Sequence, residues 1–219
     1  MEQIQTLPSK AELAHRSLRT AIVRGDLEPG SRLVIDDLAR QLGVSQIPIR
    51  EALQRLQADG LVEFESHVGP RVTEIKTDSV HEIFDLKEAL EVISGRAACQ
   101  RMSEDDLNRV EDVLQKMGDL TEDLDRWSEE NVYFHILICR FAGTPLVGHL
   151  MAKVLDHWER LRRTYLTEVL ARRIGIAHEE HSRILESLRT REPDRVEQMI
   201  REHSRSACAA YAEHLGEHR

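Results

Sequence analysis

The feature that most constrains this chain is the stretch from Asp36 to Asp59, which predicts two short helices joined by a tight turn. Leu38, Ala39 and Leu42 share one face of the first helix, and Gly43 follows where a left-handed C-terminal cap costs least. Two helices at this spacing are typical of a DNA-reading helix-turn-helix, and also of an ordinary helical hairpin. The two helices alone leave both interpretations open.

The second helix of the pair has different residues on its inner and outer faces. Ser45 stands at the expected N-cap, and Pro48 falls in the first turn, where a missing N–H is harmless. The apolar residues recur at helical spacing and must be buried: Ile49, Ala52, Leu53 and Leu56. The outer face presents Gln46, Ile47, Arg50, Glu51 and Gln54. We therefore expect this helix to enter the major groove.

Two predicted strands follow the second helix and favour the DNA-binding interpretation. Gly60 ends the helix, and residues 61–65 and 71–75 are expected to form strands around the turn Ser-His-Val-Gly-Pro. A hairpin in this place is a wing. His67 lies in its turn and is expected to face DNA.

Several motifs around this unit resemble the winged helix-turn-helix of the GntR family of bacterial transcription regulators: GDLEPG (25–30), LARQLGVS (38–45), PIREAL (48–53), GLV (60–62) and Gly69. The resemblance implies binding to double-stranded operator DNA. The predicted contact residues are Ser45, Gln46, Ile47, Arg50, Gln54, His67, Gly69 and Arg71. The family usually has Arg after the serine of the turn, where this chain has Gln46. Because Gln favours adenine and Arg favours guanine, the base preference should differ.

The formal net charge of −9 is spread unevenly along the chain. Residues 1–76 hold ten Lys/Arg and eleven Asp/Glu, and the remaining residues hold twenty and twenty-eight. DNA binding therefore requires a local basic patch, for which Arg50 and Arg71 are candidates, and two copies binding together.

The sequence predicts a soluble, cytoplasmic protein that makes no contact with a membrane. There is no apolar run near eighteen residues and no signal peptide. Cys99, Cys139 and Cys208 match no C-x-x-C pattern and lie in helical stretches, so we expect buried free thiols in a reducing cytosol.

The predicted fold class is mainly α, with an N-terminal winged helix-turn-helix domain (1–76) and an antiparallel all-helical bundle (77–219). Six helices are expected in the bundle, because six apolar stripes recur at helical spacing. The stripe of the first is Ile83, Leu86, Leu90, Ile93 and Ala97, and that of the fourth is Leu146, Leu150, Val154, Trp158 and Leu161. The interior should be built from these faces.

Four polar residues occupy positions within the apolar stripes of three bundle helices. Asn131 and His135 point inward from the third helix, His181 from the fifth and His203 from the sixth. A single buried histidine is usually a core residue with a hydrogen-bond partner, but three on one interior suit a divalent transition metal (Zn, Ni or Mn) with open coordination positions. His178 is a rival ligand, expected to open its helix and to be exposed.

The same residues resemble the all-helical effector domain, called FCD, of the FadR subfamily. The resemblance rests on Asn131-x3-His135, the segment 142–146, Glu180-His181 with Ile184-Leu185, and Glu202-His203. It implies a metal site beneath a small-molecule pocket, a small carboxylic-acid effector met by Lys87, repression relieved by that effector, and pairing into a homodimer through the helical domains. The subfamily usually has Asp where this chain has Asn131, and the change removes one negative charge.

Two function classes follow from these residues. One is a ligand-responsive transcription regulator, and the other is a metal-dependent enzyme that uses the histidines to activate water. The sequence has no H-E-x-x-H, no G-x-S-x-G and no phosphate-binding glycine loop, and a helix-turn-helix would serve no purpose in such an enzyme. We therefore predict a regulator and not an enzyme.

Overall fold

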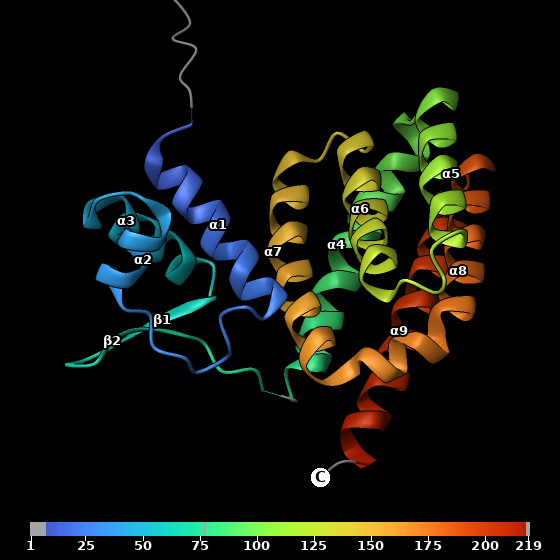
Figure 1. The fold of residues 1–219 in the computed structure, drawn as a ribbon. Coiled ribbons are helices and arrows are strands. Elements are labelled where there is room, and N and C mark those ends of the chain that lie inside the picture. The colour runs from blue at the N-terminus through green and yellow to red at the C-terminus, as the bar shows by residue number, and fades with distance from the viewer. Residues whose placement is uncertain (1–7, 77, 218–219) are drawn as a thin grey trace, which may run out of the picture. The chain divides into compact units, whose positions relative to one another are not determined.

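The computed structural model describes residues 8–76 and 78–217. The chain divides into two compact units, Met1–Lys76 and Thr77–Arg219 (Figure 1). The first has three helices and a two-stranded sheet, and the second is built from helices alone within the part that the structure describes. The predicted fold class is confirmed: mainly α, with a winged helix-turn-helix followed by a helical bundle.

Both ends of helix α1 (Lys10–Arg24) are capped by neighbouring residues. Ser9 accepts a hydrogen bond from the backbone of Glu12, whose side chain accepts one from the Ser9 backbone, so the two form a capping box. Gly25 ends the helix with φ +86°, a conformation that costs glycine little. The buried face of α1 packs against α3.

The two central helices are α2 (Ile35–Leu42) and α3 (Gln46–Ala58), separated by a turn in which Gly43 has φ +65°. Ser45 occupies the N-cap of α3, although its side chain makes no capping hydrogen bond. The predicted inner face is confirmed, because Ile49, Ala52, Leu53 and Leu56 are fully buried.

The wing consists of β1 (Val62–Glu65) and β2 (Gly69–Val72), paired antiparallel with Val62 opposite Val72. The predicted second strand, 71–75, was wrong. The tight turn lies at residues 66–68, so pairing resumes at Gly69 and Pro70 contributes to the strand. The segment before α2 extends this sheet, because the Leu33 amide donates to Pro70 and the Gly30 amide donates to Val72.

The second unit contains the six predicted helices: α4 (Ser79–Arg101), α5 (Glu104–Gly118), α6 (Leu124–Phe141), α7 (Pro145–Leu161), α8 (Thr167–Arg189) and α9 (Pro193–Glu217). A π-helical turn, η1 (Arg162–Leu166), joins α7 to α8. The fifth helix was predicted to open at His178, but α8 begins eleven residues earlier, and His178 is half-buried in its middle. A large apolar core lies between these helices and includes the fully buried Trp127 and Phe134.

The predicted inner stripes of α4 and α7 were partly wrong. Leu86 and Ile93 of α4, and Leu146 and Leu150 of α7, are exposed. The face that α4 buries carries Lys87, Glu91 and Ser94 among its apolar residues. These polar side chains find partners inside the bundle, so apolar spacing alone assigned the wrong face.

Cys99 and Cys139 are buried free thiols, and Cys208 is a half-buried free thiol. All three lie in helices, α4, α6 and α9, as expected; the predicted burial is confirmed for Cys99 and Cys139 and was wrong for Cys208.

Candidate metal centre and nucleic-acid interface

Three histidines from three different helices meet in the interior of the second unit. His135 comes from α6, His181 from α8 and His203 from α9, and all three are buried. One nitrogen of each ring lies within 4.8 Å of one nitrogen of the others. The ring centroids are 4.6 Å apart for His181 and His203, and 5.2 Å apart for His135 and His181. The predicted convergence of these histidines is thus present in the structure.

Two of the rings are oriented by carboxylates behind them. Nδ1 of His135 lies 2.5 Å from Oε1 of Glu91, and Nδ1 of His203 lies 2.8 Å from Oε2 of Glu180. A carboxylate at this distance favours the proton on Nδ1 and leaves the Nε2 lone pair free. Nε2 of His135 is buried and has no hydrogen-bond partner among the described residues. Carboxylates behind ring nitrogens are the usual support of metal-binding histidines.

His181 has a different environment. Its side chain is fully buried, and neither ring nitrogen has a hydrogen-bond partner in the part of the chain that the structure describes. The rings of Phe134 and Trp127 lie beside it, at centroid distances of 4.6 and 6.3 Å. Leaving a buried polar atom without a partner costs free energy. A divalent metal on the three imidazoles would give one of the two His181 nitrogens a partner, so the donor set fits a transition metal.

Burial lowers the pKa of each histidine. The pKa of His135 falls to about 4, although Glu91 opposes the shift. Burial also lowers the pKa of His181 well below its usual value, and that of His203, where Glu180 opposes the shift. Burial raises the pKa of Glu91, but nearby His135 and Lys87 outweigh it and hold that pKa far below its usual range. The rings are therefore neutral at pH 7, which is the form that binds metal.

A cavity of about 30 Å³ lies at the cluster. Asn131, one helical turn before His135, lines it together with Lys87 and two of the histidines. The Lys87 ammonium is buried and lies 2.7 Å from Oε1 of Glu91. The remaining wall is largely aromatic, from Phe84, Trp127, Trp158 and Tyr211. A cavity of this size holds about one water molecule, so a larger ligand requires the surrounding helices to move apart.

Three charged residues of this site were missed by the sequence analysis: Glu91, Glu180 and Arg173. Arg173 is buried on α8, and its Nη2 lies 2.7 Å from Oε2 of Glu180. The i, i+4 spacing of Lys87 and Glu91 was a usable signal, because such a pair stays together when a helix face is buried. His178 was expected to be exposed, but it is half-buried, with its ring close to Gly118 of α5.

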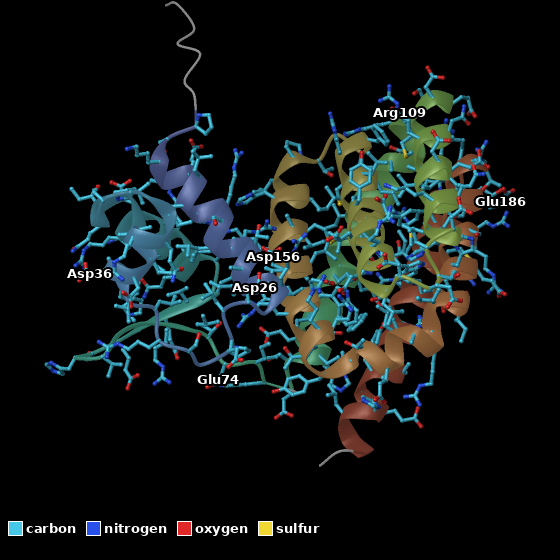
Figure 2. The ribbon with its side chains drawn as sticks, viewed as in Figure 1. Asp26, Asp36, Glu74, Arg109, Asp156 and Glu186 are labelled. Carbon is cyan, nitrogen blue, oxygen red and sulfur yellow. The ribbon has the colours of Figure 1, made fainter. Side chains whose placement is uncertain are left out.

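In the first unit, the predicted DNA-contacting residues of α3 lie on its exposed side. Ser45, Gln46, Ile47, Arg50 and Gln54 are all exposed at or after the start of the helix. The Gln46 amide donates to the side chain of Asp36, which is labelled at the start of α2 in Figure 2. Ile47 is 68% exposed, which is unusual for an isoleucine and leaves it available for a contact.

The three predicted contact residues of the wing differ in how exposed they are and in the contacts that they already make. His67 is exposed in the turn with φ +66°, and Gly69 follows with φ +102°. The guanidinium of Arg71 donates to the Gly30 carbonyl through Nε (2.9 Å) and lies 3.2 Å from Glu65 through Nη1. Arg71 therefore holds the wing to the segment before α2, and only part of its charge faces outward.

Comparisons with known proteins agree with both units. Residues 9–72 match the family described as "Bacterial regulatory proteins, gntR family", and residues 82–206 match the FCD domain. The LutR regulator of Bacillus subtilis is 28% identical over 74% of this chain and 83% of its own length. A probable D-xylose utilization operon transcriptional repressor of Paenarthrobacter nicotinovorans is 29% identical over 89% and 85%. The structure of E. coli McbR/YncC has the same fold, with a TM-score of 0.82, 20% identity and coverage of 94% and 99%.

A winged helix-turn-helix joined to a helical effector domain defines a DNA-binding transcription regulator. The chain belongs to the GntR family of bacterial regulatory proteins and carries an FCD domain. The alternative of a metal-dependent enzyme is wrong, because the family and the relatives are transcription regulators. Among the described residues, no helix is long and apolar enough to span a membrane.

Proposed function

We propose that this regulator is a homodimeric repressor that leaves its operator when a small carboxylic acid binds at a metal in the helical unit. The main support for the proposal is the histidine cluster. Three buried imidazoles have nitrogens within 4.8 Å of one another, and neither nitrogen of His181 has a hydrogen-bond partner among the described residues. The name of the D-xylose operon repressor supports repression as the mode of control.

Operator recognition is assigned to the exposed start of α3 and to the wing. Arg50 lies on the outer side of α3, while Leu53 and Leu56 hold the helix from behind. Gln46 would read an adenine, and Ser45, Ile47 and Gln54 would complete the contacts of this helix. His67, Gly69 and Arg71 would meet the sugar-phosphate backbone from the wing.

The metal ligands in this proposal are His135, His181 and His203, with the Asn131 side-chain oxygen as a weaker fourth donor. A neutral three-imidazole set with an oxygen donor suits Zn, Ni or Mn. The metal would supply an electropositive position for the carboxylate of the effector. Glu91 and Glu180 keep His135 and His203 oriented for this role.

The effector would enter the cavity beside Lys87 and Asn131. Because about 30 Å³ is too small for any organic acid, binding must widen the space that α4, α6, α7, α8 and α9 enclose. A ligand that binds only the wider form shifts the population toward it. This is how binding inside the bundle could change DNA affinity.

Pairing is assigned to the exposed apolar face of α4 and α7. Phe84 packs on Trp158, and Arg101 donates to the Ala142 carbonyl just before α7, so the two helices run antiparallel. Leu86 and Ile93 of α4, and Leu146 and Leu150 of α7, are exposed, Leu146 by 70%. A second copy of the chain would cover this face, and two winged units would double the phosphate contacts that one nearly neutral unit makes.

A gel-shift experiment with the DNA upstream of the chain's own gene tests the proposal. Zn²⁺-loaded protein should shift this DNA, and one or more small carboxylic acids should reverse the shift. The same acids should have no effect on protein stripped with EDTA. A shift that no acid reverses, in the presence or absence of metal, would contradict the proposed mode of regulation.

A further inference from the structure

Arg173 is a buried cation on the wall of the cavity whose hydrogen-bonding capacity is only partly used. Its side chain is 4% exposed. Nη2 lies 2.7 Å from Glu180 and 3.5 Å from the His203 carbonyl. Nε and Nη1 donate to none of the described residues. Because Arg173 lines the cavity, these remaining donors are available to a ligand there.

Lys87, the other cation on the wall, contacts a carboxylate of its own helix. Its ammonium lies 2.7 Å from Glu91, and Glu91 is also 2.5 Å from His135. A ligand carboxylate at Lys87 would therefore lie beside the like-charged carboxylate of Glu91. A ligand carboxylate could instead bind the remaining N–H groups of the Arg173 guanidinium while Glu180 keeps its contact. A guanidinium binds carboxylates in bidentate geometry.

Charge balance gives a second, independent argument. Lys87 is balanced by Glu91, and Arg173 by Glu180. A divalent metal on three neutral imidazoles and the neutral Asn131 would add two positive charges to a buried site. One carboxylate cancels one of them, and two carboxylates cancel both, which matters because uncompensated buried charge is costly.

We propose that Arg173 binds a second carboxylate of the effector, so that the site takes a short dicarboxylic acid. This inference rests on the proposed metal and effector site. One carboxylate would bind to the metal at an open coordination position. The other would accept hydrogen bonds from Nε and Nη1 of Arg173. The hydrocarbon between them packs on the apolar and aromatic wall of Phe84, Trp158 and Tyr211, whose rings form a cluster.

The experiment is a calorimetric titration of Zn²⁺-loaded protein with acids paired by chain length: malonate with propionate, succinate with butyrate and glutarate with pentanoate. At least one dicarboxylate should bind tenfold or more tightly than its monocarboxylate partner. Arg173→Gln should lose that preference, bind the monocarboxylate within twofold of wild type and retain its metal. Arg172→Gln, which removes the exposed neighbour on α8, is the matched control and should keep the preference.

Three outcomes would overturn the inference: equal binding of both members of every pair, an unchanged preference in Arg173→Gln, or no binding of any acid in the series. Loss of metal from Arg173→Gln would also overturn it, because Arg173 would then only support Glu180 behind His203. The proposed function can fail separately. Release of operator DNA by a monocarboxylate as readily as by its dicarboxylate partner contradicts the inference alone, whereas wild-type protein that binds no metal contradicts the proposed function.

Discussion

His181→Leu should stabilise the metal-free helical unit while abolishing its stabilisation by metal. The wild-type ring is fully buried with two unpartnered nitrogens among the described residues, and Phe134 and Trp127 surround it. An unsatisfied buried polar group costs about 1–3 kcal/mol, and leucine of similar volume removes that cost. For a chain of this length, at about 2–4 °C per kcal/mol, the melting temperature in EDTA should rise by roughly 2–12 °C.

Metal should have the opposite effect on the two proteins. At a free concentration one hundred times Kd, it should stabilise the wild type by about 2.7 kcal/mol and leave His181→Leu unchanged. The assay is thermal unfolding followed by tryptophan fluorescence, with Zn²⁺ or EDTA. Both tryptophans, Trp127 and Trp158, lie in the helical unit, so the signal reports that unit alone.

The control is His149→Gln, which removes an exposed imidazole from the same unit and should respond to Zn²⁺ like the wild type. The reasoning is refuted if His181→Leu melts below the wild type in EDTA. It is also refuted if Zn²⁺ raises the melting temperature of both proteins equally.

Three further outcomes are expected. Arg50→Ala should weaken operator binding in fluorescence anisotropy by about 1–3 kcal/mol with an unchanged melting temperature, and equal affinity would argue against α3 as the recognition helix. Asn131→Asp should tighten metal binding in competition with a chromogenic chelator, because it adds a charged oxygen ligand; weaker binding would remove residue 131 from the ligand set. Ile93→Glu should convert the proposed dimer to a monomer in light scattering, because it places charge on the exposed face of α4 and α7, whereas a dimer that persists would place the interface elsewhere.

Local chemistry made much of the first unit predictable. The left-handed cap at Gly43 and the buried stripe of α3 depend on residues within a few positions of each other. The second strand of the wing was misplaced because a strand boundary depends on where its partner turns, and the sequence pattern does not give this register.

In the second unit, the sequence located the histidines but not their supporting shell. His135, His181 and His203 could be found because each continues an apolar stripe of its own helix. Glu180 and Arg173 were missed because a charged residue at a helical position is expected to face solvent until its surroundings in the fold are known, and for Glu91 the one signal was its i, i+4 spacing from Lys87. For the same reason the predicted inner face of α4 was partly wrong: Ile83 is buried, but Leu86 and Ile93 are exposed, and the buried face includes Lys87 and Glu91.

The central claim is that three buried histidines hold a metal in this regulator, and metal analysis tests it most directly. Protein purified without chelators and then equilibrated with Zn²⁺ should contain about one metal ion per chain by mass spectrometry of the metal content. His203→Ala should contain almost none, since the ring of His203 completes the cluster with His135 and His181. Wild-type protein without stoichiometric metal, or equal metal content in the two proteins, would contradict the account.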